Sequence, residues 1–305
     1  MPVLVDINPD TWCLDVSAAE AAITPRTRAV TVVHVYSAVA DLTGLRELAD
    51  RYGLPLIEDC AHAHGAAYRY RPVGGHGVAG VFSMQGSKLL TSGEGGAVVT
   101  DDDELAHRAE ALRGDGRVRR PGPINCGEME LVETGRLMGA NAALSEFHAA
   151  VLIDQLDLLA TQNAQRASNA ARLDRGLSAY GARPQATSDG TTVRAYYRYA
   201  VQLPGVVIAA RPVDDIAAEL TTSLGFPVLR THPPLSRCRL LDPATRPRFS
   251  GRRDYLARVD PTRFELPVCH SVHNSVLSFG HEILLAPAEA MDEIVDAFRE
   301  ILTLC

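Results

Sequence analysis

The sequence predicts an α/β layered fold with a largely parallel sheet, followed by a smaller α+β domain. In the first half of the chain, short β-branched segments alternate with segments whose apolar residues recur at helical spacing. Beyond about residue 165 the pattern changes, and residues 231–250 are rich in Pro and Arg. We therefore expect a large domain over residues 1–165 and a small C-terminal domain over residues 166–305.

The first elements follow in order from the N-terminus. Residues 3–7 are a short apolar segment that we expect to be a strand, and residues 18–23 are expected to form a short helix. Residues 29–36 are rich in β-branched side chains, which is typical of a buried strand. Residues 42–52 repeat apolar side chains at helical spacing, and Gly53 follows as a C-terminal stop.

The alternation continues through the rest of the large domain. A strand is expected over residues 54–58, two more over residues 80–84 and 96–100, and a helix over residues 102–112. In α/β sheets of this kind, ligands bind beyond the carboxyl ends of the strands. Because Asp59 directly follows the strand over 54–58, we expect it to lie at the ligand-binding edge.

A long helix is expected from Leu144 to about Tyr180, and Gly181 ends it. Its apolar stripe consists of Leu144, Phe147, Val151, Leu152, Leu156 and Leu159. The remaining predicted elements are strands at 196–202 and 226–230, and helices at 213–222 and 291–302.

Composition limits the class of protein. With 46% hydrophobic and 22% charged residues, the 305-residue chain is typical of a globular protein. Its net charge of −7 argues against a nucleic-acid partner, which favours a basic surface. Its six cysteines include no Cys-x-x-Cys pair, which favours reduced thiols. Without a signal-peptide pattern or a membrane-length apolar stretch, we expect a cytoplasmic protein with no membrane partner.

Two charged residues indicate the chemistry. Lys88 lies in a turn rich in Ser and Gly, and Asp59 emerges from an earlier strand. A pyridoxal phosphate enzyme needs such a pair, because the lysine forms the Schiff base and the acid partners the pyridinium nitrogen. Hydroxyl groups of the turn, with Ser83 before it, can donate to phosphate oxygens.

A metal site is the alternative interpretation of the segment after Asp59. Cys60, His62 and His64 could supply thiolate and imidazole ligands, but they alternate along the chain. The sequence contains no second ligand pair with zinc-like spacing. We therefore expect no metal, and a metalloprotein using these three residues stays open as a weaker hypothesis.

Three segments resemble the DegT/StrS family of sugar aminotransferases: Glu58-Asp59-Cys60-Ala61-His62-Ala63-His64-Gly65, Phe82-Ser83 … Lys88 … Gly93-Glu94-Gly95-Gly96, and Gly139-Ala140-Asn141 … Glu146-Phe147 … Ala149-Ala150. The lysine block is similar to the aminocyclitol branch, as are His232-Pro233-Pro234-Leu235 and His281-Glu282-Ile283-Leu284-Leu285. The resemblance implies fold type I, pyridoxal 5'-phosphate and a homodimer with shared active sites.

The resemblance also implies a role for each matching residue. Lys88 would be the Schiff-base lysine and proton shuttle, and Asp59 would partner the pyridine nitrogen. His62 would lie against the cofactor, Ser83 would bind its phosphate, and Asn141 would reach the phosphate of the neighbouring subunit. A lysine at position 88 argues against the dehydratase members of the family, which carry His there.

The expected function is transamination of a keto-cyclitol or keto-sugar, with L-glutamine or glutamate as amino donor, in aminoglycoside biosynthesis. Members of the family carry a further N-terminal segment with a phosphate-binding turn, and here Met1 begins at a later strand of their pattern. That departure leads to the alternative hypothesis: a truncated, inactive homologue or a partner subunit with a binding or structural role.

Overall fold

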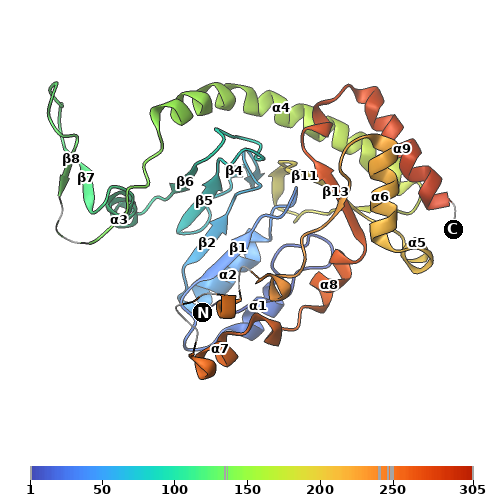
Figure 1. Ribbon diagram of the computed structural model, residues 1–305, viewed down its shortest axis with the longest axis horizontal. Helices are drawn as coiled ribbons and strands as arrows, with labels where there is room; N and C mark the ends of the chain where they lie inside the picture. The colour runs from blue at the N-terminus through green and yellow to red at the C-terminus, as the bar shows by residue number, and fades with distance from the viewer. Residues whose placement is uncertain are drawn as a thin grey trace.

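The computed structural model of the chain is shown in Figure 1. It describes residues 2–133, 135, 137–239, 242–245, 247 and 251–303. A sheet with its helices forms the lower part of the view, a second sheet with α6 and α9 lies at the right, and the long helix α4 passes over both (Figure 1). The expected α/β class with a smaller α+β part is confirmed.

The first sheet consists of β1 (Val30–Val33), β2 (Leu56–Asp59), β5 (Ala79–Ser83) and β6 (Gly96–Val99), in that order. β1, β2 and β5 are parallel, and β6 runs antiparallel to β5. Asp59 is in register with Val33 on one side and Val81 on the other. The carboxyl ends of three neighbouring strands therefore meet at one edge, as predicted.

Two helices of this part begin and end at sequence signals. Asp15 caps α1 (Val16–Ala22), and its carboxylate accepts from the backbone N–H of Ala18. α2 has the predicted bounds, Leu42–Tyr52, and ends at Gly53, which has a left-handed φ of 62°. Leu42 and Leu45 are buried in one core with β1 and β2, and burial of each leucine contributes about 1.5–3 kcal/mol to the stability of the fold.

The prediction of a strand over residues 3–7 is wrong. Only Ile7 pairs, in a single bridge with Leu14. The carboxylate of Asp6 instead accepts from the backbone N–H groups of Val268 and Cys269, at 2.8 and 2.9 Å, in the first turn of α8 (Pro267–His273). This segment therefore caps a distant helix rather than joining a sheet.

The predicted strand over 29–36 is shorter in the structure, where β1 spans Val30–Val33. Tyr36, at the predicted end, has a φ of 56° and lies outside the extended region. Several short elements were not predicted, since the strands among them have two or three residues and the one helix has six, too few to show a clear periodicity. They are β3 (Ala67–Tyr68), β4 (Arg71–Pro72), β7 (Arg117–Arg119), β8 (Leu131–Glu133), β9 (Arg183–Pro184), β10 (Thr191–Val193) and α5 (Gly205–Ala210).

α3 (Asp103–Arg113), β7 and β8 form an arm that extends away from the rest of the chain (Figure 1). From this arm the chain returns through α4 (Glu146–Ser178), which Ser145 caps. The predicted stripe of α4 is largely exposed, with Phe147 87% exposed. The C-terminal half of the helix is buried instead, partly through the polar side chains of Asn163, Arg166 and Asn169.

The second sheet has the order β12 (Leu229–Arg230), β13 (Val276–Gly280), β11 (Arg198–Gln202) and β9. α6 (Val213–Leu224), α9 (Ala288–Thr303) and the end of α4 share one core with it. The 3-10 turns are η1 (Leu235–Arg237), η3 (Pro243–Thr245), η5 (Pro261–Arg263) and η6 (Ile283–Leu285), and α7 spans Arg253–Val259. The domain boundary at residue 165 stays a prediction, and α4 runs through it unbroken.

Among the described residues, no helix has both the length and the apolar character needed to cross a membrane.

Candidate active site

The carboxyl-end edge of the first sheet carries the predicted acid and hydroxyl. Asp59 ends β2, and one of its carboxylate oxygens, Oδ1, accepts from the backbone N–H of Ala61 at 3.0 Å. Ser83 ends the neighbouring strand β5, and its hydroxyl accepts from the backbone N–H of Gln85 at 3.4 Å. The second oxygen of Asp59 and the hydroxyl hydrogen of Ser83 bond to no residue that the structure describes.

His62 presents a flat, uncharged ring at this edge. Its ring stacks on Tyr197, with centroids 3.9 Å apart and 17° between the planes. Its Nδ1 accepts from the backbone N–H of Tyr36 at 3.3 Å, so the proton is on Nε2. Burial, with the nearby charge of Lys88, lowers the pKa of His62 to about 3, and the ring is therefore neutral at neutral pH.

Lys88 contacts the Tyr197 ring from a different turn. Its Nζ lies 4.4 Å from the centroid of Tyr197. The turn closes through the backbone N–H of Lys88, which donates to the carbonyl of Gln85 at 2.9 Å. Lys88 is also the only lysine in the sequence, against 29 arginines among the 30 basic residues. Any reaction that requires an ε-amine must therefore take place at this residue.

Three further contacts hold the lysine turn. The hydroxyl of Ser87 lies 3.2 Å from that of Tyr197, and it donates to the side chain of Gln85 at 2.7 Å. Nε2 of His281 donates to the carbonyl of Ser87 at 3.2 Å. Residues from both halves of the chain thus converge on the turn.

The structure brings Lys88, Asp59, His62 and Ser83 to one region and places Asn141 elsewhere. Asn141 is exposed and forms a single bridge with Gly114, at the end of α3. Among the described residues, no contact joins it to the other four. Its role at the site of a neighbouring subunit stays a prediction.

The alternative metal site does not assemble from its predicted residues. Nε2 of His64 donates to the carbonyl of Ser83 at 2.9 Å, while His62 is engaged with Tyr36 and Tyr197. Within the described parts of the chain, the ligand atoms of Cys60 come together instead with those of His34 and Glu58.

That buried trio is a hydrogen-bond network. Nδ1 of His34 accepts from the backbone N–H of Ala40 at 3.2 Å, so Nε2 carries the proton and donates to Glu58 at 3.3 Å. Both imidazole nitrogens are used, and His34 offers no lone pair to a metal.

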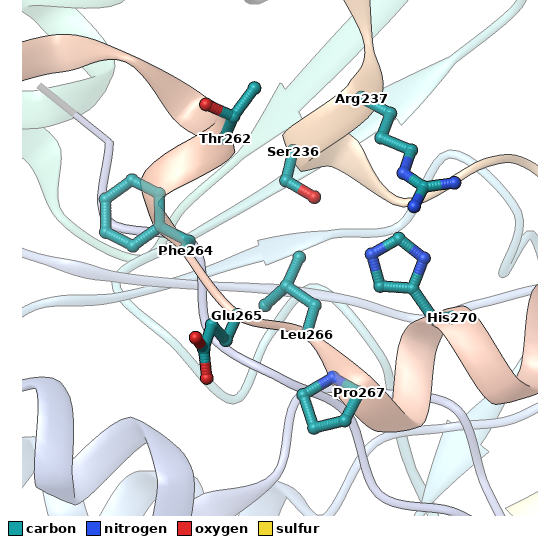
Figure 2. A pocket seen from close by; sticks show the side chains of 8 residues that line it. All are labelled: Ser236, Arg237, Thr262, Phe264, Glu265, Leu266, Pro267 and His270. Carbon is teal, nitrogen blue, oxygen red and sulfur yellow. The ribbon is translucent and has the colours of Figure 1, made fainter. Parts of the chain in front are cut away.

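A separate cavity of about 480 Å³ lies between η1 and the start of α8 (Figure 2). Arg237 and His270 point toward one another across it, and Phe264 and Leu266 contribute apolar surface. None of the predicted site residues lines this cavity.

Sequence reasoning missed Tyr197, Tyr36 and Arg166, and it noted His281 only as part of a resemblance. No local pattern marks Tyr197, because its partners His62 and Lys88 are distant in the sequence. The single lysine was a signal available from composition alone.

The side chains fit pyridoxal phosphate. The cofactor requires an amine, an acid for its ring nitrogen, a flat neighbour for its ring and donors for its phosphate. Lys88, Asp59, His62 and Ser83 supply these four kinds of group. The second carboxylate oxygen of Asp59 and the hydroxyl hydrogen of Ser83 have no partner among the described residues. The face of His62 that Tyr197 covers would be the one for a cofactor ring near Lys88, and the cofactor would take the place of the Tyr197 ring there.

Known proteins are similar to this chain in sequence and in fold. The chain is 62% identical over 302 residues to an L-glutamine:scyllo-inosose aminotransferase of Streptomyces griseus, covering 99% of this chain and 71% of the relative. It is 54% identical over 302 residues to an L-glutamine:2-deoxy-scyllo-inosose aminotransferase of Streptomyces fradiae, again covering 99% of this chain and 71% of the relative.

Solved structures agree. The crystal structure of 3-amino-5-hydroxybenzoic acid synthase superposes with a TM-score of 0.80 at 28% identity, over 99% of this chain and 74% of the other. That of DesV from S. venezuelae, in complex with a ketimine intermediate, gives 0.79 at 32% identity, over 99% and 72%. Residues 1–226 match the family's sequence pattern, and the chain therefore belongs to the DegT/DnrJ/EryC1/StrS aminotransferase family.

Proposed function

We propose that the chain binds pyridoxal 5'-phosphate at Lys88 and transfers an amino group from L-glutamine to a keto-cyclitol of the scyllo-inosose type. The identity of 62% to a relative named for this reaction supports the donor and the acceptor. The observation that carries the proposal is the convergence of the chain's only ε-amine with the neutral ring of His62, beside the sheet edge where Asp59 ends β2. Other keto-sugars are the alternative acceptors.

Each residue has a distinct task. The bound cofactor would draw electron density from the carbon that carries the amino group. The carboxylate of Asp59 would face the ring nitrogen and stabilise a proton there. His62 would cover one face of the ring as a neutral plane, Ser83 would donate to the phosphate, and Nζ of Lys88 would accept and return the proton of the donor carbon.

We also propose a homodimer in which Asn141 serves the partner's site. Its exposed position at the base of the arm supports this assignment. The apolar residues that α4 exposes, such as Phe147 and Ile153, support an intersubunit contact along the same helix.

The test is the absorption spectrum of the purified chain with pyridoxal phosphate, before and after L-glutamine. We expect a band from the lysine-bound cofactor that L-glutamine removes, and its return when scyllo-inosose is added. Lys88→Ala should lose the band, because no other ε-amine exists in the chain. An unchanged band in Lys88→Ala, or no band in the parent chain, would refute the assignment. A nucleotide-linked keto-hexose serves as the comparison acceptor.

A further inference from the structure

Arg166 is a buried cation that forms no ion pair with a described residue, although the charge of Glu282 acts on it from a greater distance. Its exposed fraction is 1%, and no described carboxylate lies within ion-pair distance of its guanidinium. Nε has no hydrogen-bond partner among the described residues. Burying a charge without an ion pair costs free energy unless its N–H groups form hydrogen bonds. The hydrogen bonds of Nη1 and Nη2 therefore stabilise the buried guanidinium.

One guanidinium nitrogen leads to the lysine turn. Nη2 of Arg166 donates to Nδ1 of His281 at 3.3 Å. The proton of His281 is therefore on Nε2, which donates to the carbonyl of Ser87, the residue before Lys88, at 3.2 Å. Burial and the charge of Arg166 lower the pKa of His281, which keeps the ring neutral and in this one tautomer.

The other nitrogen leads to the acid side of the site. Nη1 of Arg166 donates to Oδ1 of Asn163 at 3.0 Å, and Nδ2 of Asn163 donates to the carbonyl of His64 at 2.9 Å. A Cβ at Gly65 would lie 2.7 Å from that nitrogen, so the glycine leaves the room that Asn163 needs. The segment held here follows Asp59 and carries His62.

We propose that Arg166 is a positioning residue that ties the two halves of the active site together. The first arm of this link is Asn163 to the carbonyl of His64, and the second is His281 to the carbonyl of Ser87. Because the two arms meet in one planar guanidinium, Arg166 sets the distance between the segment carrying His62 and the turn carrying Lys88. The structural claim stands on these contacts; its effect on cofactor capture rests on the proposed function.

Hydrogen–deuterium exchange of the chain without added cofactor tests the link directly. Arg166→Met should raise exchange about tenfold to a hundredfold in residues 61–65 and 85–90 together, since each segment loses one hydrogen bond that depends on a charged group. Exchange in α2 should stay unchanged. Arg172→Met is the matched control, because Arg172 lies on the same helix but pairs with Asp292 at the surface.

Single-arm variants separate the two connections. His281→Phe should loosen only residues 85–90, and Asn163→Leu only residues 61–65. In an Arg166→Met background, neither should add a further increase, because the shared element has already been removed. If Arg166→Met does not fold, the two single-arm variants decide the question, with each expected to affect its own segment alone.

Attachment of pyridoxal phosphate gives the second readout. After borohydride reduction, mass spectrometry of the peptide that carries Lys88 follows the label there, apart from any label on the N-terminal α-amine, since the chain has a single lysine. Arg166→Gln is used beside Arg166→Met because lysine would add a second amine. We expect attachment at Lys88 to slow at least about tenfold, as misplacement of a reacting group predicts.

The outcomes are distinguishable. Unchanged exchange in both segments, or equal loosening of α2, would overturn the positioning role, and so would attachment at the rate of the parent chain. If the parent chain itself does not attach the cofactor, the proposed function is wrong. The exchange experiment still tests whether Arg166 positions the two segments, because it needs no cofactor.

Discussion

Replacing Glu58 by glutamine tests the network that holds Asp59 at the edge of the sheet. Glu58 is fully buried in β2. Oε1 accepts from the backbone N–H groups of His76 and Gly77, at 2.7 Å each. Oε2 accepts from the backbone N–H of Gly74 at 2.8 Å and from Nε2 of His34 at 3.3 Å. Every partner is a donor, and both oxygens are used.

Glutamine cannot satisfy these donors. In either orientation, its NH₂ group faces two N–H donors where the carboxylate offers an acceptor. Two hydrogen bonds to a charged group are lost, each contributing about 1.5–3 kcal/mol. We therefore expect Glu58→Gln to lower the free energy of unfolding by about 3–6 kcal/mol. Urea unfolding of the chain without cofactor measures it.

Glu20→Gln is the matched control. Glu20 accepts from Arg51 at 2.6 Å and from the hydroxyl of Tyr52 at 3.1 Å, but its side chain is 39% exposed. Its replacement should cost less than about 1 kcal/mol. If Glu58→Gln costs no more than Glu20→Gln, the reasoning from buried donors is wrong.

The same carboxylate predicts a pH dependence. Burial alone would raise the pKa of Glu58, but hydrogen bonds from His34 and from the backbone of Gly74 and Gly77 outweigh it and hold the pKa below its ordinary value of 4.5. A group with a lowered pKa in the folded state stabilises the fold above the unfolded pKa. This stabilisation is lost as pH falls through the folded pKa, and the loss should be absent in Glu58→Gln.

Two further predictions concern titratable groups. Iodoacetamide should alkylate the exposed Cys126 well before Cys13 and Cys60, because burial raises the pKa of Cys13 to about 11 and also raises that of Cys60. Peptide mass spectrometry measures the rates, and labelling of Cys60 at the rate of Cys126 would contradict the buried core. His62→Phe should bind pyridoxal phosphate nearly as well as the parent chain, and His62→Ala should bind it about tenfold more weakly, because the ring acts as a neutral plane that also stacks on Tyr197. A fluorescence titration measures the affinities, and an equal loss of affinity in both variants would show that the imidazole nitrogens are required instead.

Local patterns were sufficient for much of the fold. α2 has the predicted bounds because its apolar spacing and its glycine stop act within eleven residues. The strand before Asp59 was recognised from its apolar run, and the parallel arrangement then placed that acid at the correct edge. The turn with Lys88 was identified from its neighbours in the chain. In each case the information lies within one element.

Predictions failed where a partner distant in the sequence decides the conformation. β13 lies at the centre of the second sheet, yet its short apolar run has no periodicity that separates it from a loop. Residues 3–7 have the composition of a strand, but Asp6 is drawn to the first turn of α8. The apolar spacing of α4 predicts a buried face, but Phe147 and its neighbours are exposed in the structure.

The sequence by itself determined the layered class, the family and the one amine that can react, because these depend on local spacing and on residue types. Only the tertiary structure decided the setting of that amine. Tyr197 comes between His62 and Lys88, and Arg166 reaches both sides of the site, through contacts between elements far apart in the chain. A hydrogen bond or a ring stack requires two groups within a few ångströms, and no pattern along the chain encodes that distance.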